Sequence, residues 1–237
     1  MKSSVFLPDD GVTLLGGGPF AADHLAKAIN ITSRLVCADG GYNAARAAGL
    51  TPEVVIGDLD SLEDPDTARE TLGERLLHVE EQDSTDLEKC LSRIEAPFIV
   101  GVGLLGGRMD HSLAALHAII ADPRPIILIG EEDIVFAAPL ELAIRLEAGD
   151  RLSIFPLLPV SGRGGDALKW PIEGLNFEAG SLIGTSNEVV RPDVSLGFNK
   201  RGTVICTPPE RLVGVLDALL SDPSAGHNSG EDRPERV

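Results

Sequence analysis

Aromatic residues, cysteine and positive charge are scarce in this chain, and each shortage excludes a class of protein. The 237 residues include 3 Cys and 4% aromatic residues, and 20 Lys and Arg stand against 37 Asp and Glu, for a formal net charge of −17. Cys37, Cys90 and Cys206 have no paired spacing, so neither a disulfide framework nor a zinc site is expected. The negative charge would repel nucleic acid and anionic lipid, so no nucleic acid and no membrane is expected as a partner.

Long hydrophobic runs are missing as well. No apolar stretch approaches the roughly 20 residues that a membrane span needs. Residues 1–10 hold no apolar stretch of the length that a secretory signal requires. Hydrophobic residues still make up 43% of the chain, which is enough to form packed cores. We therefore expect a cytoplasmic globular protein with two domains.

The first half alternates short apolar runs with helical stretches, a pattern typical of a parallel sheet flanked by helices. The sequence predicts a doubly wound α/β domain over residues 1–138, with a mostly parallel sheet and helices on both faces. The expected strands are Val12–Leu15, Arg34–Ala38, Glu53–Ile56, Leu76–Val79, Phe98–Val102 and Ile126–Ile129. The expected helices are Ala21–Asn30, Asn43–Ala48, Thr85–Arg93 and Asp110–Ala121.

The second half has strand-like runs joined by Gly and Pro turns without intervening helices. It predicts a smaller antiparallel β domain over residues 139–220. The expected strands are Leu142–Leu146, Leu152–Phe155, Leu168–Ile172, Val194–Phe198 and Thr203–Cys206. Residues 221–237 are polar and rich in Gly, Pro, Ser and charge, so a disordered tail is expected there.

Two acidic clusters follow expected strands, at the edge where open α/β sheets bind ligands. In the first, Asp39 precedes Gly40 and Gly41, which allow a close approach of the backbone to a ligand, and Asn43 follows. Taken alone, this short string is better explained as a tight turn with a solvated Asp. In the second, Asp58 and Asp60 alternate along extended chain and therefore project to the same side.

The alternating pair Asp58 and Asp60 is suited to Mg²⁺, which prefers hard oxygen ligands and is commonly shared with substrate phosphates. Such an ion would let an acidic protein bind a polyphosphate. The alternative is structural, because Ser61 before Leu62, Glu63 and Asp64 is a fair helix N-cap.

Two further clusters stand at expected helix starts. Residues 81–89 place Ser84 or Thr85 as a cap before acids in the first helical turn, which by itself explains most of that segment. Residues 103–111 form a glycine-rich loop that contains Arg108 and leads from a strand into a helix. Backbone N–H groups at such a junction attract phosphate, and Arg can bind it bidentately. Gly16-Gly17-Gly18-Pro19 has the same setting but matches no complete phosphate-binding motif.

Taken in order and at these intervals, the clusters resemble the thiamine pyrophosphokinase family. The similar segments are DGGYNAARAAGLTPEVVIGDLDSL (39–62), QDSTDLEKCL (82–91), GLLGGRMDH (103–111), LKWPIEGL (168–175) and GTSNE (184–188). The resemblance implies an α/β catalytic domain, a C-terminal β-sandwich domain and a homodimer with active sites between subunits. It also implies that ATP and thiamine react, with Mg²⁺, to give AMP and thiamine diphosphate.

The resemblance further implies roles for individual residues. Asp39, Asp58, Asp60 and Asp86 would bind magnesium, and Asp58, Asp60, Asp86 and Arg108 would carry catalysis. The nucleotide and its phosphates would contact Asp39, Gly40, Gly41, Asn43, Lys89, Gly106, Gly107, Arg108 and Asp110. Thiamine would contact Gln82, Asp86, Trp170, Ser186 and Asn187, the last three from the partner subunit.

Alternatives remain for the substrate and for the thiamine end of the site. The same phosphate chemistry could act on another small alcohol, such as a hydroxymethyl-pterin, and a non-catalytic thiamine- or nucleotide-binding protein could share the fold. The many carboxylates argue against the binder, because a polyphosphate would face them without a metal. Locally, Trp170 could be a core residue of a small β domain, and Ser186 with Asn187 could form only a turn.

Overall fold

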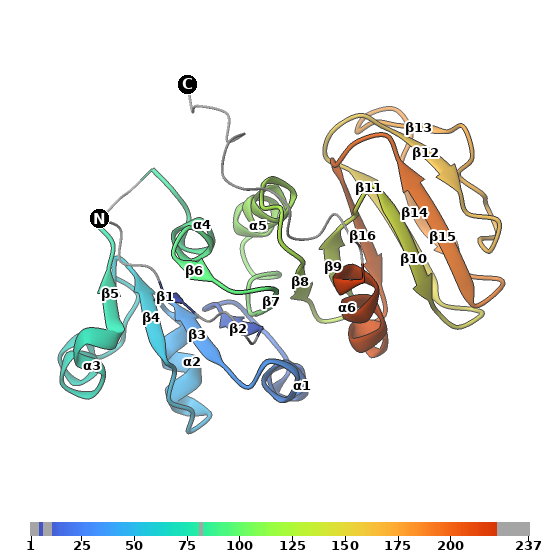
Figure 1. Cartoon of the computed structure of the whole chain (residues 1–237). Helices are drawn as coiled ribbons and strands as arrows, with labels where there is room; N and C mark the ends of the chain where they lie inside the picture. Colours follow the sequence, from blue (N-terminus) through green and yellow to red (C-terminus); the bar gives the residue numbers. More distant parts are fainter. Residues whose placement is uncertain (1–4, 7–10, 81–82, 222–237) are drawn as a thin grey trace.

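The chain folds around one long sheet that runs through both of its halves (Figure 1). The computed structural model describes residues 5–6, 11–80 and 83–221. Its helices are α1 (Ala22–Thr32), α2 (Gly41–Ala47), α3 (Pro65–Leu72), α4 (Asp86–Leu91), α5 (Met109–Ala121) and α6 (Leu212–Leu220). Its strands in the first half are β1 (Val5–Phe6), β2 (Val12–Leu15), β3 (Leu35–Ala38), β4 (Val54–Gly57), β5 (Leu76–His78), β6 (Ile94–Glu95), β7 (Ile99–Val102), β8 (Ile126–Ile129) and β9 (Ile134–Ala137).

The first half is a doubly wound α/β unit, as the sequence predicts. The parallel strands stand in the order β8-β7-β2-β3-β4-β5, so the chain leaves β2 toward one side and later returns to its other side at β7. Strands β2, β3, β4, β7 and β8 are buried along their whole length, which explains their continuous apolar runs. Loops that follow β2 and β7 therefore diverge at a topological switch point, where such sheets bind ligands.

Helices cover both faces of the parallel strands (Figure 1). Apolar side chains of α1, α2 and α3, such as Leu25, Tyr42 and Leu72, belong to the core on one face. Side chains of α4 and α5, such as Leu87 and Ile119, belong to the core on the other face. The sheet thus holds the first turns of α2, α4 and α5 near the carboxyl ends of the strands.

The second half is a sandwich of antiparallel strands. Its strands are β10 (Glu141–Arg145), β11 (Arg151–Pro156), β12 (Val160–Gly164), β13 (Asn176–Phe177), β14 (Gly184–Glu188), β15 (Asp193–Phe198) and β16 (Thr203–Thr207). One layer is a four-stranded sheet in the order β10-β15-β12-β13. The other layer is the end of the ten-stranded sheet, in the order β14-β11-β16-β9 before β8. Leu142 and Leu196 of the first layer share one core with Ile154 and Ile205 of the second.

Several elements differ from the sequence prediction. The strand expected at Leu168–Ile172 is wrong: only an isolated bridge joins Leu168 to Val189. The hydrophobic pattern did not predict two of the helices, α3 and α6. Helix α3 is capped by Asp64 and begins at Pro65. Because the ten-stranded sheet takes strands from both sides of residues 138 and 139, with β9 before them and β11, β14 and β16 after them, the expected domain boundary there stays a prediction. No helix among the residues that the structure describes is long and apolar enough to span a membrane.

Candidate active site

A cavity of about 480 Å³ lies at the carboxyl ends of the parallel strands, at the switch point between β2 and β7. Its wall comes from loops after β2, β3, β4 and β7 and from the starts of α4 and α5. The lining residues are Gly16, Gly17, Gly18, Pro19, Ala38, Gly40, Asn43, Ser61, Thr85, Asp86, Leu87, Gly103, Leu104, Gly106, Gly107, Arg108, His111 and Ala115. We call this space, together with Asp39, Asp58 and Asp60 beside it, the acidic cavity.

Close approach of backbones explains why glycines form so much of this wall. A Cβ atom on Gly41 would lie 2.0 Å from the carbonyl oxygen of Leu15, so the turn after β3 packs directly on the end of β2. Gly106 and Gly107 have φ angles of 81° and 63°, in the left-handed region that other residues rarely adopt. The glycine-rich strings of the sequence are thus required by the local geometry of the wall.

Three carboxylates converge beside the cavity. Asp39, Asp58 and Asp60 each offer an oxygen within 4.8 Å of the other two, a spacing that a single cation could bridge. Asp39 is only 1% exposed and has a φ angle of 38°, so the fold holds it in an uncommon conformation. Its Oδ2 accepts a hydrogen bond from the Ser61 N–H (3.3 Å), whereas its Oδ1 has no partner among the described residues.

Burial raises the pKa of Asp39 from 3.8 to about 6. The hydrogen bond from Ser61 opposes this rise, and the nearby negative charges of Asp86 and Asp58 add to it. A buried carboxylate with an unpartnered oxygen is costly unless something pairs with it. A divalent cation is one group that could pair with this buried oxygen.

A buried lysine stands behind the carboxylates. The Lys89 side chain is 3% exposed, and its ammonium donates to Asp58 Oδ2 (2.9 Å) and to Asp86 Oδ1 (3.2 Å). Its hydrogen bond to Asp58 holds the pKa of that carboxyl below the ordinary value. Burial works against the charge of Lys89, but Asp58 and Asp86 outweigh it, and the lysine pKa is raised. Asp86 is thus tied to Lys89 rather than to the three converging carboxylates.

Asn43 connects two loops of the wall. Its Nδ2 donates to the Ser61 carbonyl (2.8 Å), and its Oδ1 accepts from the Glu63 N–H (3.1 Å). These bonds join the start of α2 to the loop that carries Asp58 and Asp60. Asn43 lines the cavity and its amide maintains the shape of the wall, while its contact with a nucleotide stays a prediction.

The glycine-rich loop before α5 is held by its own helix. Ser112 Oγ accepts from the Gly106 N–H (3.1 Å), and the guanidinium of Arg108 makes a two-pronged pair with Asp110. The Arg108 and Asp110 side chains are 70% and 64% exposed, so this pair lies at the open rim. Arg108 lines the cavity, and the structure places Asp110 as its partner.

The residues expected at the thiamine end form a second assembly, which we call the Trp170 group: Trp170, Ser186 and Asn187. The Asn187 amide accepts from the Trp170 N–H (3.2 Å) and donates to the Trp170 carbonyl (2.7 Å), so it fixes the backbone under the ring. Trp170 is 55% exposed, which excludes the core position considered for it. Ser186 lies in β14 with a φ of 61°, and its N–H donates to Ser153 Oγ (3.0 Å).

Within one chain the Trp170 group cannot reach the acidic cavity. Strand β14 is the end of the ten-stranded sheet and β3 lies seven strand-to-strand steps away, a separation along the sheet of roughly 33 Å. None of the described residues that line the cavity comes from 139–221. Gln82 and the tail residues 222–237 lie outside the described residues.

Sequence reasoning missed part of the wall. It gave little weight to Gly16–Pro19, which the structure places along one side of the cavity, and it did not single out Ser112. The strand-loop-helix setting of Gly16–Pro19 was the available signal. For Ser112 there was none, because its contact with Gly106 depends on how the loop folds back on α5.

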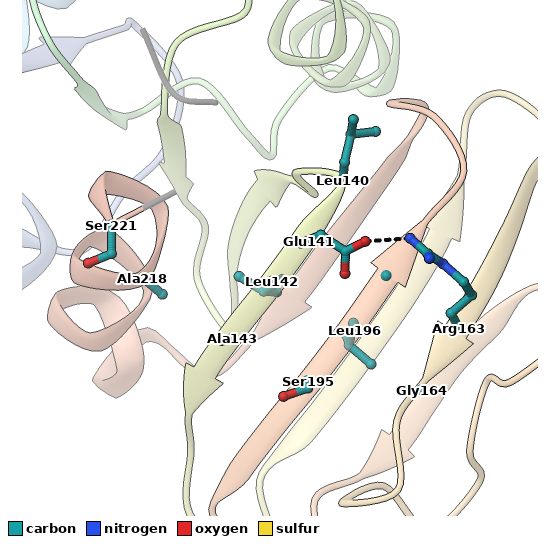
Figure 2. A pocket seen from close by; sticks show the side chains of 11 residues that line it. Leu140, Glu141, Leu142, Ala143, Arg163, Gly164, Ser195, Leu196, Ala218 and Ser221 are labelled. Atoms are coloured by element: carbon teal, nitrogen blue, oxygen red, sulfur yellow. Dashed lines mark hydrogen bonds and ion pairs between the residues drawn. The ribbon is translucent and has the colours of Figure 1, made fainter. Parts of the chain in front are cut away.

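A larger hollow, of about 630 Å³, lies in the β domain and has a different character (Figure 2). It runs over β10 and β15 beside the end of α6, between Leu140, Ala143 and Ser221. Its charged residues, Glu141 and Arg163, pair with each other. No group of acids converges there among the residues described, so the larger volume does not mark the chemistry.

Comparison with known proteins gives a consistent result for both halves. A family model described as "Thiamin pyrophosphokinase, catalytic domain" matches residues 25–128, and one described as "Thiamin pyrophosphokinase, vitamin B1 binding domain" matches residues 140–201. "Thiamin pyrophosphokinase 1" of Caenorhabditis elegans is 31% identical over 229 residues, which cover 86% of this chain and 91% of that protein.

Solved structures share the fold. Thiamin pyrophosphokinase from Candida albicans superimposes with a TM-score of 0.72 at 15% identity, covering 84% of this chain and 90% of the other. Yeast thiamin pyrophosphokinase gives a TM-score of 0.68 at 16% identity, covering 93% of both chains. At these identities the structural likeness supports the architecture alone.

Proposed function

Because the chain belongs to the thiamin pyrophosphokinase family, we propose that it transfers pyrophosphate from ATP to the hydroxyl group of thiamine, giving thiamine diphosphate and AMP. The observation that carries the proposal is the convergence of Asp39, Asp58 and Asp60 beside a glycine-walled cavity at the sheet's switch point. Carboxylates in such a place suit a nucleotide triphosphate only if a cation stands between them.

We propose Mg²⁺ as that cation. The residues fit it, since the ligands offered are hard carboxylate oxygens and the buried Asp39 Oδ1 lacks a partner among the described atoms. Asp39, Asp58 and Asp60 would hold the ion directly. Asp86, which the resemblance adds to the metal ligands, would act from the far side of Lys89. When bound, the ion would offset the negative charge of the phosphate oxygens.

The other residues of the cavity would mainly position the reactants, because phosphoryl-type transfer leaves little covalent chemistry to the protein. The triphosphate of ATP would lie along Gly40, Gly106 and Gly107, where the backbone is accessible. Arg108 would exchange its exposed pairing with Asp110 for a phosphate oxygen. The thiamine hydroxyl would attack the β-phosphorus in line, and AMP would leave.

We propose that the working unit is a homodimer. The Trp170 group lies roughly 33 Å along the sheet from β3, so its own acidic cavity is out of reach. An exposed tryptophan on a fixed backbone is suited to stacking on an aromatic ring of a ligand bound by the partner subunit. Residues 1–138 would then supply ATP chemistry and residues 139–220 thiamine binding, in accord with the two matched family models. The cytoplasmic location stays a prediction.

The test is an incubation with ATP, Mg²⁺ and thiamine in which nucleotide products are separated. AMP with thiamine diphosphate is the expected outcome. ADP would instead identify a simple kinase, and no thiamine-dependent nucleotide product would point to a binding protein. Replacing thiamine by a hydroxymethyl-pterin gives the matched control for substrate class, and faster AMP formation with the pterin would overturn the assignment.

A further inference from the structure

A buried lysine, Lys89, lies directly behind the wall of the acidic cavity. Lys89 lies on α4 and is 3% exposed, and the lining of the cavity includes its neighbours Asp86 and Leu87 but not Lys89 itself. Its ammonium is bonded to Asp58 and Asp86, two of the acids nearest the cavity. Because its ammonium is buried and directed at these two carboxylates, a phosphate in the cavity would meet it only if the Lys89 side chain moved.

The backbone around Lys89 makes such a movement costly. Thr85 and Glu88 form a reciprocal capping box that fixes the first turn of α4. Leu87, Cys90 and Leu91 of the same helix are buried in the core on that face of the sheet. Helix α4 packs against β4, and Asp58 follows the end of that strand. The distance between the Lys89 stem and Asp58 is therefore set by the core, and not by the ligand.

We propose that Lys89 is a positioning residue and not a phosphate contact: a permanent internal cation that orients Asp58 and Asp86 and offsets part of the charge of the acidic cluster. The inference deepens the proposed function and rests on it. By fixing Asp58 from behind, Lys89 keeps a carboxylate oxygen of that residue within 4.8 Å of Asp39 and Asp60. Its charge also makes the four acids tolerable to the folded chain before any cation binds.

This role predicts opposite effects on metal binding and on turnover. Lys89→Met keeps most of the stem and removes the charge. A nearby unit of positive charge is then lost. At an effective dielectric constant of about 20 the lost repulsion of a dication outweighs the poorer orientation of Asp58, so the free protein should bind Mg²⁺ at least about tenfold more tightly. Turnover should nevertheless fall about tenfold or more, because Asp58 and Asp86 are no longer oriented, and KM for ATP at saturating Mg²⁺ should stay within about twofold of the unmodified value.

The experiment measures Mg²⁺ binding by calorimetry without nucleotide, and kcat and KM for ATP separately. Lys27→Met is the matched control, because Lys27 makes an exposed ion pair with Asp23 on α1, and it should change none of these quantities. Lys89→Arg keeps the charge but displaces it. It should bind Mg²⁺ within about threefold of the unmodified protein while kcat remains reduced, since guanidinium and ammonium donate with different geometry.

A contrary pattern would overturn the proposal. If Lys89→Met left Mg²⁺ affinity unchanged or weaker and raised KM for ATP, Lys89 would contact the phosphates directly. If the Met variant did not fold, the same decision would rest on Lys89→Arg, for which raised KM with unchanged kcat contradicts positioning. Mg²⁺ binding is measured without nucleotide, so it can contradict the role of Lys89 independently of activity. Failure of the proposed function would instead appear as absence of AMP formation by the unmodified protein.

Discussion

The acidic cavity and the Trp170 group belong to the same long sheet but are built in opposite ways. At the cavity, four loops and two helix starts converge on one edge of parallel strands, and buried charges face one another. At the other end, a single antiparallel edge strand and one loop present an exposed ring on a fixed backbone. The first place is arranged to hold charge. The second leaves an aromatic ring exposed.

The sharpest way to separate the two regions is to remove a carboxylate from the cavity. Asp60→Asn should lower kcat by roughly 100- to 1,000-fold, the usual range when one group that offsets transition-state charge is lost. Asp60 is exposed, so the melting temperature should change little. Steady-state kinetics and thermal unfolding measure both effects.

Asp66→Asn is the matched control for this change, because Asp66 is an exposed acid on α3 that pairs only with Arg69 among its described contacts. Near-normal turnover of Asp60→Asn would remove Asp60 from the metal role.

The second prediction concerns pH and is specific to the cavity. The pKa of Asp39 is about 6 in the folded chain, above the ordinary 3.8, so between these values the folded state retains a proton that the unfolded state has released. The free energy of unfolding should therefore fall as pH rises through this window, by up to about 3 kcal/mol, and then stay level. Asp39→Asn should remove this decline.

Chemical denaturation at pH 4 and pH 7.5, with a chelator present, measures the difference. The Asn variant should be the more stable protein at pH 7.5, since it buries no charge, and should lose turnover. Parallel behaviour of the two proteins with pH would show that Asp39 is not protonated near pH 6.

At the other end of the sheet the expected effect is smaller. Trp170→Ala should raise KM for thiamine roughly tenfold, the loss expected for one aromatic contact, while KM for ATP and the melting temperature stay the same. Val213→Ala removes a similarly exposed apolar side chain from α6 and serves as the control. A large loss of stability in Trp170→Ala would mean that the ring packs within its own subunit.

The two regions can also be tested together. Asp60→Asn damages the cavity of its own chain, and Trp170→Ala damages the surface offered to the partner. Mixed subunits should form one site with neither defect, so the mixture should exceed the summed activity of the separate proteins at low thiamine. Differently tagged chains would show that the subunits exchange. If the mixture then had only the summed activity of the separate proteins, both residues would belong to the site of one subunit.

Much of the fold could be predicted from the residues. Buried parallel strands are continuous apolar runs, so β2, β7 and β8 were located almost to the residue. The prediction failed where hydrophobic pattern does not determine structure. Leu168 and Ile172 are buried in the core without forming a ladder, and β14 consists of small and polar residues that resemble a turn. At both segments, pairing with the neighbouring chain determined the structure: Leu168 forms only a bridge with Val189, and β14 is a strand because it pairs with β11.

The sequence by itself determined the layout of parallel strands, the acids and glycines at the strand ends, and the resemblance to a family, because all of these depend on residue type and short spacing. Tertiary structure decided which of those groups meet. It buried Lys89 between Asp58 and Asp86, paired Arg108 with Asp110, and set the Trp170 group seven strands from β3. The physical reason is that contacts between distant segments depend on strand order and packing, which no local pattern encodes.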